Sequence, residues 1–169
     1  MRVALTPSMK GAIAEAVIAA EAAKAGIGVL RPIVEGLRYD LVFDIGDHLL
    51  RIQCKSGRAR NGVVVIGTRS CRHTPRGYVR SSYTAREIDA IAAYCADLNT
   101  CYFLPIEEID GSSTVHLRIA PAANNQRVAV RYAAHFEFRG AIAQLGERLT
   151  GSQEVGGSNP PSSTPRPLF

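Results

Sequence analysis

Three polar side chains in the stretch YDLVFDIGDHLLRIQCKSG, residues 39–57, have the types needed for phosphodiester hydrolysis. Asp40 precedes one apolar run, and Gln53 and Lys55 lie at the end of the next. A carboxylate and further oxygen ligands can hold a hard divalent cation such as Mg²⁺. A neighbouring lysine can stabilise the charge that builds on the phosphate. Such a site also needs a second acid, and Glu15 in an upstream helical segment could supply it.

A β-hairpin with Gly46 and Asp47 as its two-residue turn would bring these side chains together. In that register Asp40 faces Gln53 across the two strands. Because side chains alternate between the faces of a strand, Asp40, Gln53 and Lys55 gather at one end of the polar face. The opposite face is uniformly apolar, which favours this register. Its residues are Leu41, Phe43, Leu50, Ile52 and Cys54.

The Ala-rich segment 9–25 is predicted to form the helix that carries Glu15, with Ser8 as its N-cap and Gly26 as its stop. Glu15 can complete the site if this helix packs beside the hairpin. The side chains expected to face the core are Ile13, Val17, Ala20 and the stem of Lys24.

Positive charge is concentrated in residues 48–86, which contain nine Lys or Arg and no Asp or Glu, in a chain of net charge +5. Eight of the nine are arginines, whose planar guanidinium suits phosphates and base edges. A solvated basic surface would usually be interspersed with acids. We therefore expect this segment to bind double-stranded DNA. The predicted DNA contacts are Arg58, Arg60, Arg69, Arg72, His73, Arg76 and Arg80.

The remaining pattern predicts an α/β fold with a mixed sheet flanked by helices. Residues 72–82 are predicted to form a long basic loop. Thr84 and Glu87 have capping-box spacing, which predicts a second helix. Its apolar residues would be Ile88, Ile91, Ala92, Cys95 and Leu98. Short strands are predicted in residues 29–36, 62–70, 101–109, 113–120 and 127–132.

The length of 169 residues fits one domain with a modest extension. Its apolar runs are all shorter than the about 18 residues that span a bilayer, and residues 1–10 lack a signal-peptide pattern. The four cysteines lack CxxC spacing, so reduced thiols are expected rather than structural zinc. The chain is therefore expected to be cytoplasmic, without membrane partners.

The order of an acid on a helix, then Tyr-Asp, then Gln-x-Lys resembles the PD-(D/E)XK nuclease superfamily. It is most similar to a small bacterial and archaeal branch that includes group I intron homing endonucleases. The resemblance covers about residues 9–138 and implies a restriction-endonuclease-like fold. The stretches that carry it are KGAIAEAVIAAEAAKAG, YDLVFD, LRIQCKS, SYTAREID, AYCADL and NNQRVAVRYAAHFEF.

The resemblance also implies residue roles. Asp40 would be the central metal ligand, Glu15 and Gln53 would assist it, and the carbonyl of Cys54 would complete the metal shell. Lys55 would be the catalytic lysine. The implied cofactor is Mg²⁺, with Mn²⁺ as an expected substitute. Gln53 stands where the superfamily usually has Asp or Glu, and this neutral ligand predicts weaker Mg²⁺ binding.

The expected function is metal-dependent endonucleolytic cleavage of DNA, similar to that of homing endonucleases. Cutting both strands needs two sites, so a homo-oligomer is expected. Gln53 leaves open a non-catalytic DNA-binding protein on a nuclease fold. A junction-resolving or repair nuclease is the other alternative and would prefer branched or damaged DNA. Specificity is expected to reside in residues 58–82.

The C-terminal segment 139–169 changes in character from the predicted nuclease domain, residues 1–138. Its Gly, Ser and Pro content predicts a disordered tail. Back-translation of AQLGER and GSNP gives DNA similar to the D-arm and T-arm of a tRNA gene, in that order. We interpret this tail as a reading frame that continues across a tRNA gene, without a selected function of its own.

Overall fold

The computed structural model describes residues 4–75, 77–109, 111–120 and 130–154. Side chains are described throughout these ranges except at residues 72–74 and 150–154. The elements in chain order are α1 (Pro7–Lys24), β1 (Gly28–Leu30), β2 (Leu41–Ile45), β3 (His48–Arg60), β4 (Val63–Gly67), β5 (Arg69–Thr74), β6 (Gly77–Ser82), β7 (Ala90–Cys95), β8 (Thr100–Pro105), η1 (Ile106–Glu108), β9 (Thr114–Arg118), η2 (Ala133–Phe136) and α2 (Phe138–Glu154).

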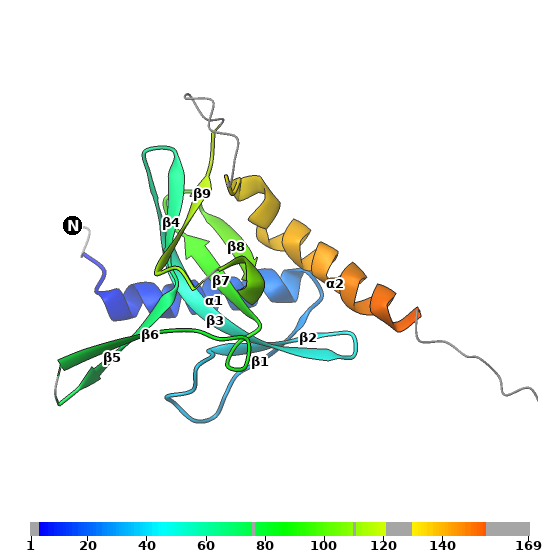
Figure 1. Cartoon of the computed structure of the whole chain (residues 1–169), viewed down its shortest axis with the longest axis horizontal. Helices are drawn as coiled ribbons and strands as arrows, with labels where there is room; N and C mark the ends of the chain where they lie inside the picture. Colours follow the sequence, from blue (N-terminus) through cyan, green and yellow to red (C-terminus); the bar gives the residue numbers. More distant parts are fainter. Residues whose placement is uncertain (1–3, 76, 110, 121–129, 155–169) are drawn as a thin grey trace, which may run out of the picture.

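A seven-stranded mixed sheet forms the centre of the molecule (Figure 1). Its longest strand, β3, pairs antiparallel with β2 along its first part and with β4 along its last part. Between these two it pairs with β7, which runs parallel to it. The sheet continues from β2 to β1, from β4 to β9 and from β7 to β8. The predicted mixed α/β sheet is therefore confirmed.

Two apolar clusters fill the space on either side of the sheet. The first includes the buried residues of both helices, so α1 and α2 pack on the same side. The second cluster lies on the opposite side of the sheet. It contains buried residues of β4 and β9, together with the residues of β7 and β8 that face this side. The strand β7 contributes Ala90 and Ala92 to the first cluster and Ile91, Ala93 and Cys95 to the second.

The predicted β2–β3 hairpin is confirmed in turn position and register. Leu41 pairs with Ile52 and Phe43 with Leu50. Gly46 has a φ of +62°, a conformation that glycine adopts without steric cost. Just before β2, the backbone N–H of Asp40 donates to the carbonyl of Ile52 at 2.9 Å, so the pairing extends to the candidate site.

The helix α1 begins two residues earlier than predicted. Thr6 is its N-cap, and the Thr6 hydroxyl accepts a hydrogen bond from the Met9 N–H at 3.2 Å. The prediction of Ser8 as the N-cap was wrong, because Pro7 occupies the first helical position and places Ser8 inside the first turn. The predicted stop is supported by Gly26, which has a φ of +78°.

The face of α1 that packs on the sheet also differs from the predicted one. The fully buried residues are Ala14, Ile18 and Ala22, one turn apart. Ile13 is 38% exposed, and Val17 only borders the core. Small alanine side chains permit the helix to lie close to the sheet, so the contact follows the alanine ridge rather than the bulkier residues.

The helix predicted after Thr84 is absent, and the segment forms strand β7 instead. One half of the capping box does form, because the Thr84 N–H donates to the Glu87 carboxylate at 3.0 Å. The Glu87 N–H donates instead to the Thr84 backbone carbonyl at 2.9 Å, which is a turn hydrogen bond. They close a single turn before the chain extends. A short apolar run buried on both faces fits a parallel strand as well as a helix, and the tertiary pairing with β3 decides between them.

The segment predicted as a basic loop is largely ordered as a second hairpin. Strands β5 and β6 form a separate two-stranded ribbon, the β5–β6 ribbon, which projects from the sheet in Figure 1. The strand predicted over residues 62–70 is divided at Thr68, whose N–H donates to the Ser113 carbonyl at 3.1 Å. That contact extends the pairing of β4 with β9 by one residue, and the ribbon strand β5 begins at the next residue, Arg69.

The strand prediction is confirmed for β9, and for β8 as far as Pro105, after which residues 106–108 form η1. The strand predicted over residues 29–36 is present only as β1, which ends at Leu30. In the predicted strand 127–132, residues 127–129 lie outside the described part, and Tyr132 forms only an isolated bridge with Arg118. The prediction of disorder from residue 139 was wrong for the helix α2, since Phe138 and Ile142 are buried in the first cluster. Residues 155–169 lie outside the described part. No helix in the described ranges has the length and apolarity needed to cross a membrane.

Candidate active site

The fold brings Asp40, Gln53 and Lys55 together at the end of the β2–β3 hairpin. The Asp40 Oδ2 accepts hydrogen bonds from the backbone N–H of Cys54 at 2.7 Å and from the Gln53 side-chain amide. The same Gln53 Nε2 donates to the Cys54 carbonyl at 3.2 Å. The carboxylate of Asp40 and the carbonyl of Cys54 therefore converge on a single position.

Burial sets the electrostatics of this cluster. The pKa of Asp40 is raised, mainly because burial disfavours its charged form. The hydrogen bond from Cys54 and the charge of Lys55 act in the opposite direction. Gln53 is only 8% exposed, so its amide is enclosed against the carboxylate. A bound cation would stabilise the charged form of this buried carboxylate.

Glu15 approaches the cluster from α1, as predicted from the sequence. It is half-buried and forms an ion pair with Arg31 at 3.7 Å. Burial raises the pKa of Glu15, the charge of Asp40 raises it further, and Arg31 lowers it. Glu15 and Asp40 therefore lie within electrostatic reach of each other, although they are 25 positions apart in the chain.

The ammonium of Lys55 is held by two oxygen acceptors. It donates to the Tyr83 hydroxyl at 3.0 Å and to the Arg69 carbonyl at 3.3 Å. Burial lowers the pKa of Lys55, Asp40 opposes this shift, and the charge of Arg38 adds to it. The sequence alone indicated the lysine but not the acceptors that fix its position.

The predicted DNA contacts lie on two elements. Arg58 and Arg60 are exposed near the end of β3, and Arg69 and Arg80 are exposed on the β5–β6 ribbon. Arg69 pairs with Ser82 and Arg80 with Cys71, so side-chain alternation puts the two arginines on one face of the ribbon. Arg76 and the side chains of Arg72 and His73 lie outside the described part of the chain.

Two residues beside the cluster, Arg38 and Tyr83, were not among the predicted site residues. Tyr83 is 8% exposed and contacts Lys55, and the Arg38 guanidinium lies 4.4 Å from the centroid of the Tyr83 ring. Arg38 lies outside the acid-free segment, so charge patterning did not identify it. Its position two residues before Asp40 was the one available signal.

The described residues include no group of three or more His, Cys, Asp or Glu side chains arranged to hold a metal ion. The candidate cluster itself contains only two acids, Asp40 and Glu15, because Gln53 is neutral. Its other oxygens come from an amide and from the backbone carbonyl of Cys54. Any metal held here therefore relies on neutral oxygen ligands as well as on carboxylates.

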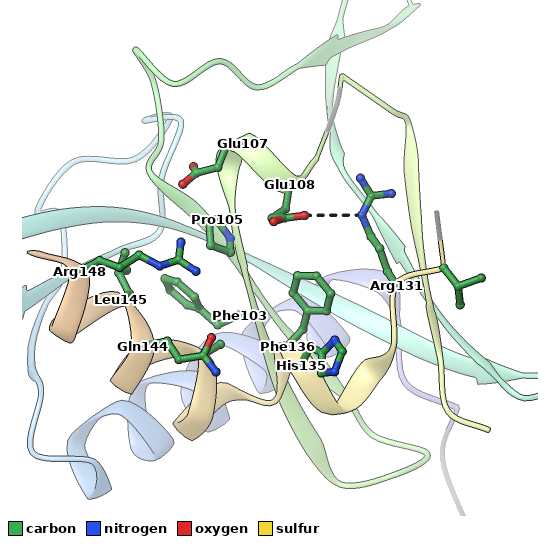
Figure 2. Close-up of a pocket in the computed structure, with 12 residues that line it drawn as sticks. Phe103, Pro105, Glu107, Glu108, Arg131, His135, Phe136, Gln144, Leu145 and Arg148 are labelled. Carbon is green, nitrogen blue, oxygen red and sulfur yellow. Dashed lines mark ion pairs between the residues drawn. The ribbon is translucent and has the colours of Figure 1, made fainter. Parts of the chain in front are cut away.

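A separate pocket of about 300 Å³ lies between β8, η1, η2 and α2 (Figure 2). Glu108 and Arg131 form an ion pair across it, with 3.9 Å between the carboxylate and the guanidinium. None of the four predicted catalytic residues lines this pocket. The candidate active site is therefore a different surface.

Comparison with known proteins gives matches to a nuclease family and to a nuclease structure. A family model described as PD-(D/E)XK endonuclease matches residues 6–139. The solved structure of a bacterial homing endonuclease, I-Ssp6803I, is similar, with a TM-score of 0.68 and 29% sequence identity. The similarity covers 89% of this chain and 99% of that chain. No curated protein matches the chain.

These matches confirm both the resemblance and the restriction-endonuclease-like fold expected from the sequence. Nucleases of this family generally use divalent metal ions. The match spans the helix that carries Glu15 and the hairpin that carries the other three candidate residues. From its family match and its structural similarity together, the chain belongs to the PD-(D/E)XK endonuclease family.

Proposed function

We propose that this endonuclease is a Mg²⁺-dependent enzyme that cleaves double-stranded DNA, with Asp40, Glu15, Gln53 and Lys55 as its active-site residues. The observation that carries this proposal is the convergence of the Asp40 carboxylate, the Cys54 carbonyl and the Lys55 ammonium at the end of one hairpin. A homing-type activity, as in the similar bacterial homing endonuclease, is the specific form that we propose.

The donor set fits a hard divalent cation. The oxygens of Asp40 and Cys54 already share one hydrogen-bond donor, the Gln53 Nε2, and so converge on one point. Mg²⁺ is typically held by one or two carboxylates together with water and phosphate oxygens. Asp40 and the Cys54 carbonyl would hold the ion, with Glu15 beside them. Gln53 would contribute its amide oxygen only after its amide turns, because its Nε2 faces these two oxygens here. Mn²⁺, which also accepts oxygen ligands, is the expected substitute.

Each protein group then has a defined task. Asp40 and the Cys54 carbonyl would hold the Mg²⁺, which when bound would supply positive charge at the scissile phosphate and favour the deprotonation of water. Lys55 holds its ammonium beside Asp40 and stabilises the negative charge that develops on the phosphate. The partial burial of Lys55 and Asp40 strengthens this interaction, because charges interact more strongly away from bulk water.

The β5–β6 ribbon supports the assignment of DNA as substrate. A two-stranded ribbon is narrow enough to enter the major groove, and Arg69 and Arg80 are exposed on one face of it. Arg58 and Arg60 extend the basic surface along β3. Phosphate contacts of this kind make binding strongly dependent on salt.

Cleavage of both strands requires two active sites, and each chain supplies one. We propose that the enzyme acts as a homo-oligomer whose symmetry presents two sites to opposite strands. Linear product formed without an accumulated nicked intermediate would support paired sites, whereas persistent nicking would contradict them.

The direct test uses the full chain and supercoiled plasmid carrying candidate target sites, with Mg²⁺, Mn²⁺ or chelator. We expect metal-dependent cleavage that falls by about 10³-fold in Lys55→Ala and in Asp40→Asn while DNA binding persists. Lys24→Ala, which removes an exposed lysine at the far end of α1, should cleave normally. Cleavage that persists in both active-site variants would refute the residue assignment.

The neutral side chain of Gln53 favours one alternative, a non-catalytic DNA-binding protein on a nuclease fold. Binding without cleavage of either plasmid or branched DNA, in any of these metals, would support that alternative. Cleavage confined to branched or damaged DNA would instead identify a junction-resolving or repair nuclease.

A further inference from the structure

The lysine at the active site depends on a neighbouring tyrosine for its position. A lysine side chain has four rotatable methylenes and cannot fix its own ammonium. The Tyr83 hydroxyl accepts a hydrogen bond from the Lys55 ammonium at 3.0 Å, and that ammonium lies 5.1 Å from the centroid of the Tyr83 ring. Tyr83 is itself buried in the second apolar cluster, so its ring is held by packing.

Arg38 joins this tyrosine to the base of the β5–β6 ribbon. Its guanidinium lies 4.4 Å from the Tyr83 ring centroid and also donates to both strands of the ribbon. The hydrogen bonds run to the Ser70 hydroxyl at 2.6 Å, the Ser81 hydroxyl at 3.1 Å and the Ser82 carbonyl at 2.8 Å. Ser70 and Ser81 are directly opposite each other in the ribbon, so Arg38 forms hydrogen bonds to both strands at one cross-strand pair.

The charge of Arg38 is neutralised locally rather than directed at the DNA. Its Nε lies 2.9 Å from one carboxylate oxygen of Glu87, and an Nη donates to the other at 3.4 Å. Glu87 is held in turn by the N–H and hydroxyl of Thr84. With its terminal nitrogens committed to these groups, Arg38 is suited to hold structure in place rather than to bind a phosphate.

We propose that Arg38 and Tyr83 are positioning residues that hold the Lys55 ammonium and the base of the β5–β6 ribbon in a fixed relation. This inference rests on the proposed function, in which Lys55 acts on the phosphate and the ribbon binds DNA. Arg38 lies two residues before Asp40, so one short segment supplies both the metal carboxylate and the clamp on the ribbon. DNA bound by the ribbon is thereby presented to the site in one register.

The test compares Tyr83→Phe and Arg38→Lys with the wild-type full chain. Tyr83→Phe retains the ring and removes only the hydroxyl, which is one of the two acceptors for Lys55. Arg38→Lys retains the charge but cannot reproduce the planar fork that contacts both strands. Under single-turnover conditions with saturating enzyme, we expect the cleavage rate constant to fall about 10-fold in Tyr83→Phe and about 100-fold in Arg38→Lys. The Kd for DNA should change by less than about 3-fold, because no exposed ribbon arginine is lost.

Arg51→Lys is the matched structural control. Arg51 is a partly buried arginine that binds Asp89 and the carbonyls of Ala85 and Arg86. Among the described residues, its hydrogen bonds reach neither the ribbon nor Lys55. We expect it to lose stability comparably to Arg38→Lys and to retain the wild-type rate constant when folded. The double variant of Arg38 and Tyr83 should be no slower than Arg38→Lys alone, because the two residues act as one unit.

The outcomes separate the two hypotheses. Cleavage by the wild type and its loss in Lys55→Ala support the proposed function in the same assay. If Tyr83→Phe then cleaves at the wild-type rate, or if folded Arg51→Lys is as slow as Arg38→Lys, the positioning role is overturned and the proposed function stands. Absence of any wild-type cleavage overturns both.

Discussion

At the scale of single residues, the candidate site concentrates polar groups whose burial opposes stability. Burial raises the pKa of Asp40 and lowers that of Lys55, so each charged form is disfavoured by its surroundings. The hydrogen bonds to Asp40 from Cys54 and Gln53 compensate only in part. Such strain is common where charges are held ready for a ligand, and removing them often stabilises a fold.

The raised pKa of Asp40 predicts a specific pH dependence. When a folded-state pKa exceeds the unfolded one, the associated stability is present below the unfolded pKa and is lost as pH rises through the folded pKa. In chelator, Asp40→Asn should therefore gain stability relative to the wild type as pH rises from about 4 to 7. Urea unfolding at several pH values measures this gain. Asp44→Asn makes the same substitution at an exposed position on β2 and is the control.

A second prediction concerns Gln53, the neutral side chain among the candidate metal ligands. Gln53→Glu would place two carboxylates in contact, and their repulsion should lower the free energy of unfolding in chelator. A divalent cation relieves this repulsion, so added Mg²⁺ should stabilise the variant more than the wild type. Thermal unfolding with and without Mg²⁺ measures the difference. Gln144→Glu, an exposed substitution of equal charge, should not respond, and an equal response in all three proteins would argue against a metal site here.

At the scale of elements, the β5–β6 ribbon and the end of β3 carry the predicted DNA-contact arginines Arg58, Arg60, Arg69 and Arg80, and the packed sheet carries the candidate active-site cluster. A ribbon outside the main sheet can follow the DNA surface while the core stays rigid. Two described contacts tie the ribbon to the site: the clamp formed by Arg38, and the hydrogen bond from the Lys55 ammonium to the Arg69 carbonyl. The exposed ribbon is suited to binding DNA and the buried end of the hairpin to holding the candidate active site, because the two elements differ in burial.

This division predicts how ribbon variants behave. Replacing both Arg69 and Arg80 by Gln should weaken DNA binding and reduce the slope of log K against log salt by about 2. Salt titration of binding measures this slope. Replacing Lys24 of α1 and Arg139 of α2 by Gln removes the same charge from another surface, where both residues pair with Glu21, and should leave the slope unchanged. An equal change in both double variants would indicate a general charge effect.

At the scale of the whole molecule, α1 and α2 cover one face of the sheet and share a single apolar cluster with it. The Phe138 ring packs edge-on against Phe43 and Phe103, with centroids 5.9 and 6.1 Å apart. The helix α2 extends beyond the matched family region, which ends at residue 139. Its first turns nevertheless complete the core of this chain.

Truncation tests the contribution of α2. Ending the chain after residue 139 removes Ile142, which is 6% exposed, and should lower the free energy of unfolding by about 2 kcal/mol. Ending it after residue 154 should leave stability unchanged. Equilibrium urea unfolding of both truncations distinguishes these outcomes. Equal stability of the shorter chain would support the interpretation of all residues after 139 as an unselected tail.

The sequence by itself determined the hairpin, the chemistry of its polar end and the family. These depend on local rules, because a two-residue turn and strict alternation leave one register that buries Leu41 and Ile52 together. Once that register is set, Asp40 must face Gln53. Asp40, Gln53 and Lys55 could therefore be proposed as one cluster before their spatial arrangement was known, whereas Glu15 was proposed from the helix and the family resemblance.

Only the tertiary structure decided the identity of β7, the face of α1 and the partners of Lys55. The run from Ala90 to Cys95 becomes a strand because β3 offers it hydrogen bonds along its whole length, which periodicity cannot reveal. Arg38 and Tyr83 meet Lys55 through chain segments 17 and 28 positions away from it. Such contacts form when distant segments pack together, and neither residue type nor local spacing encodes them.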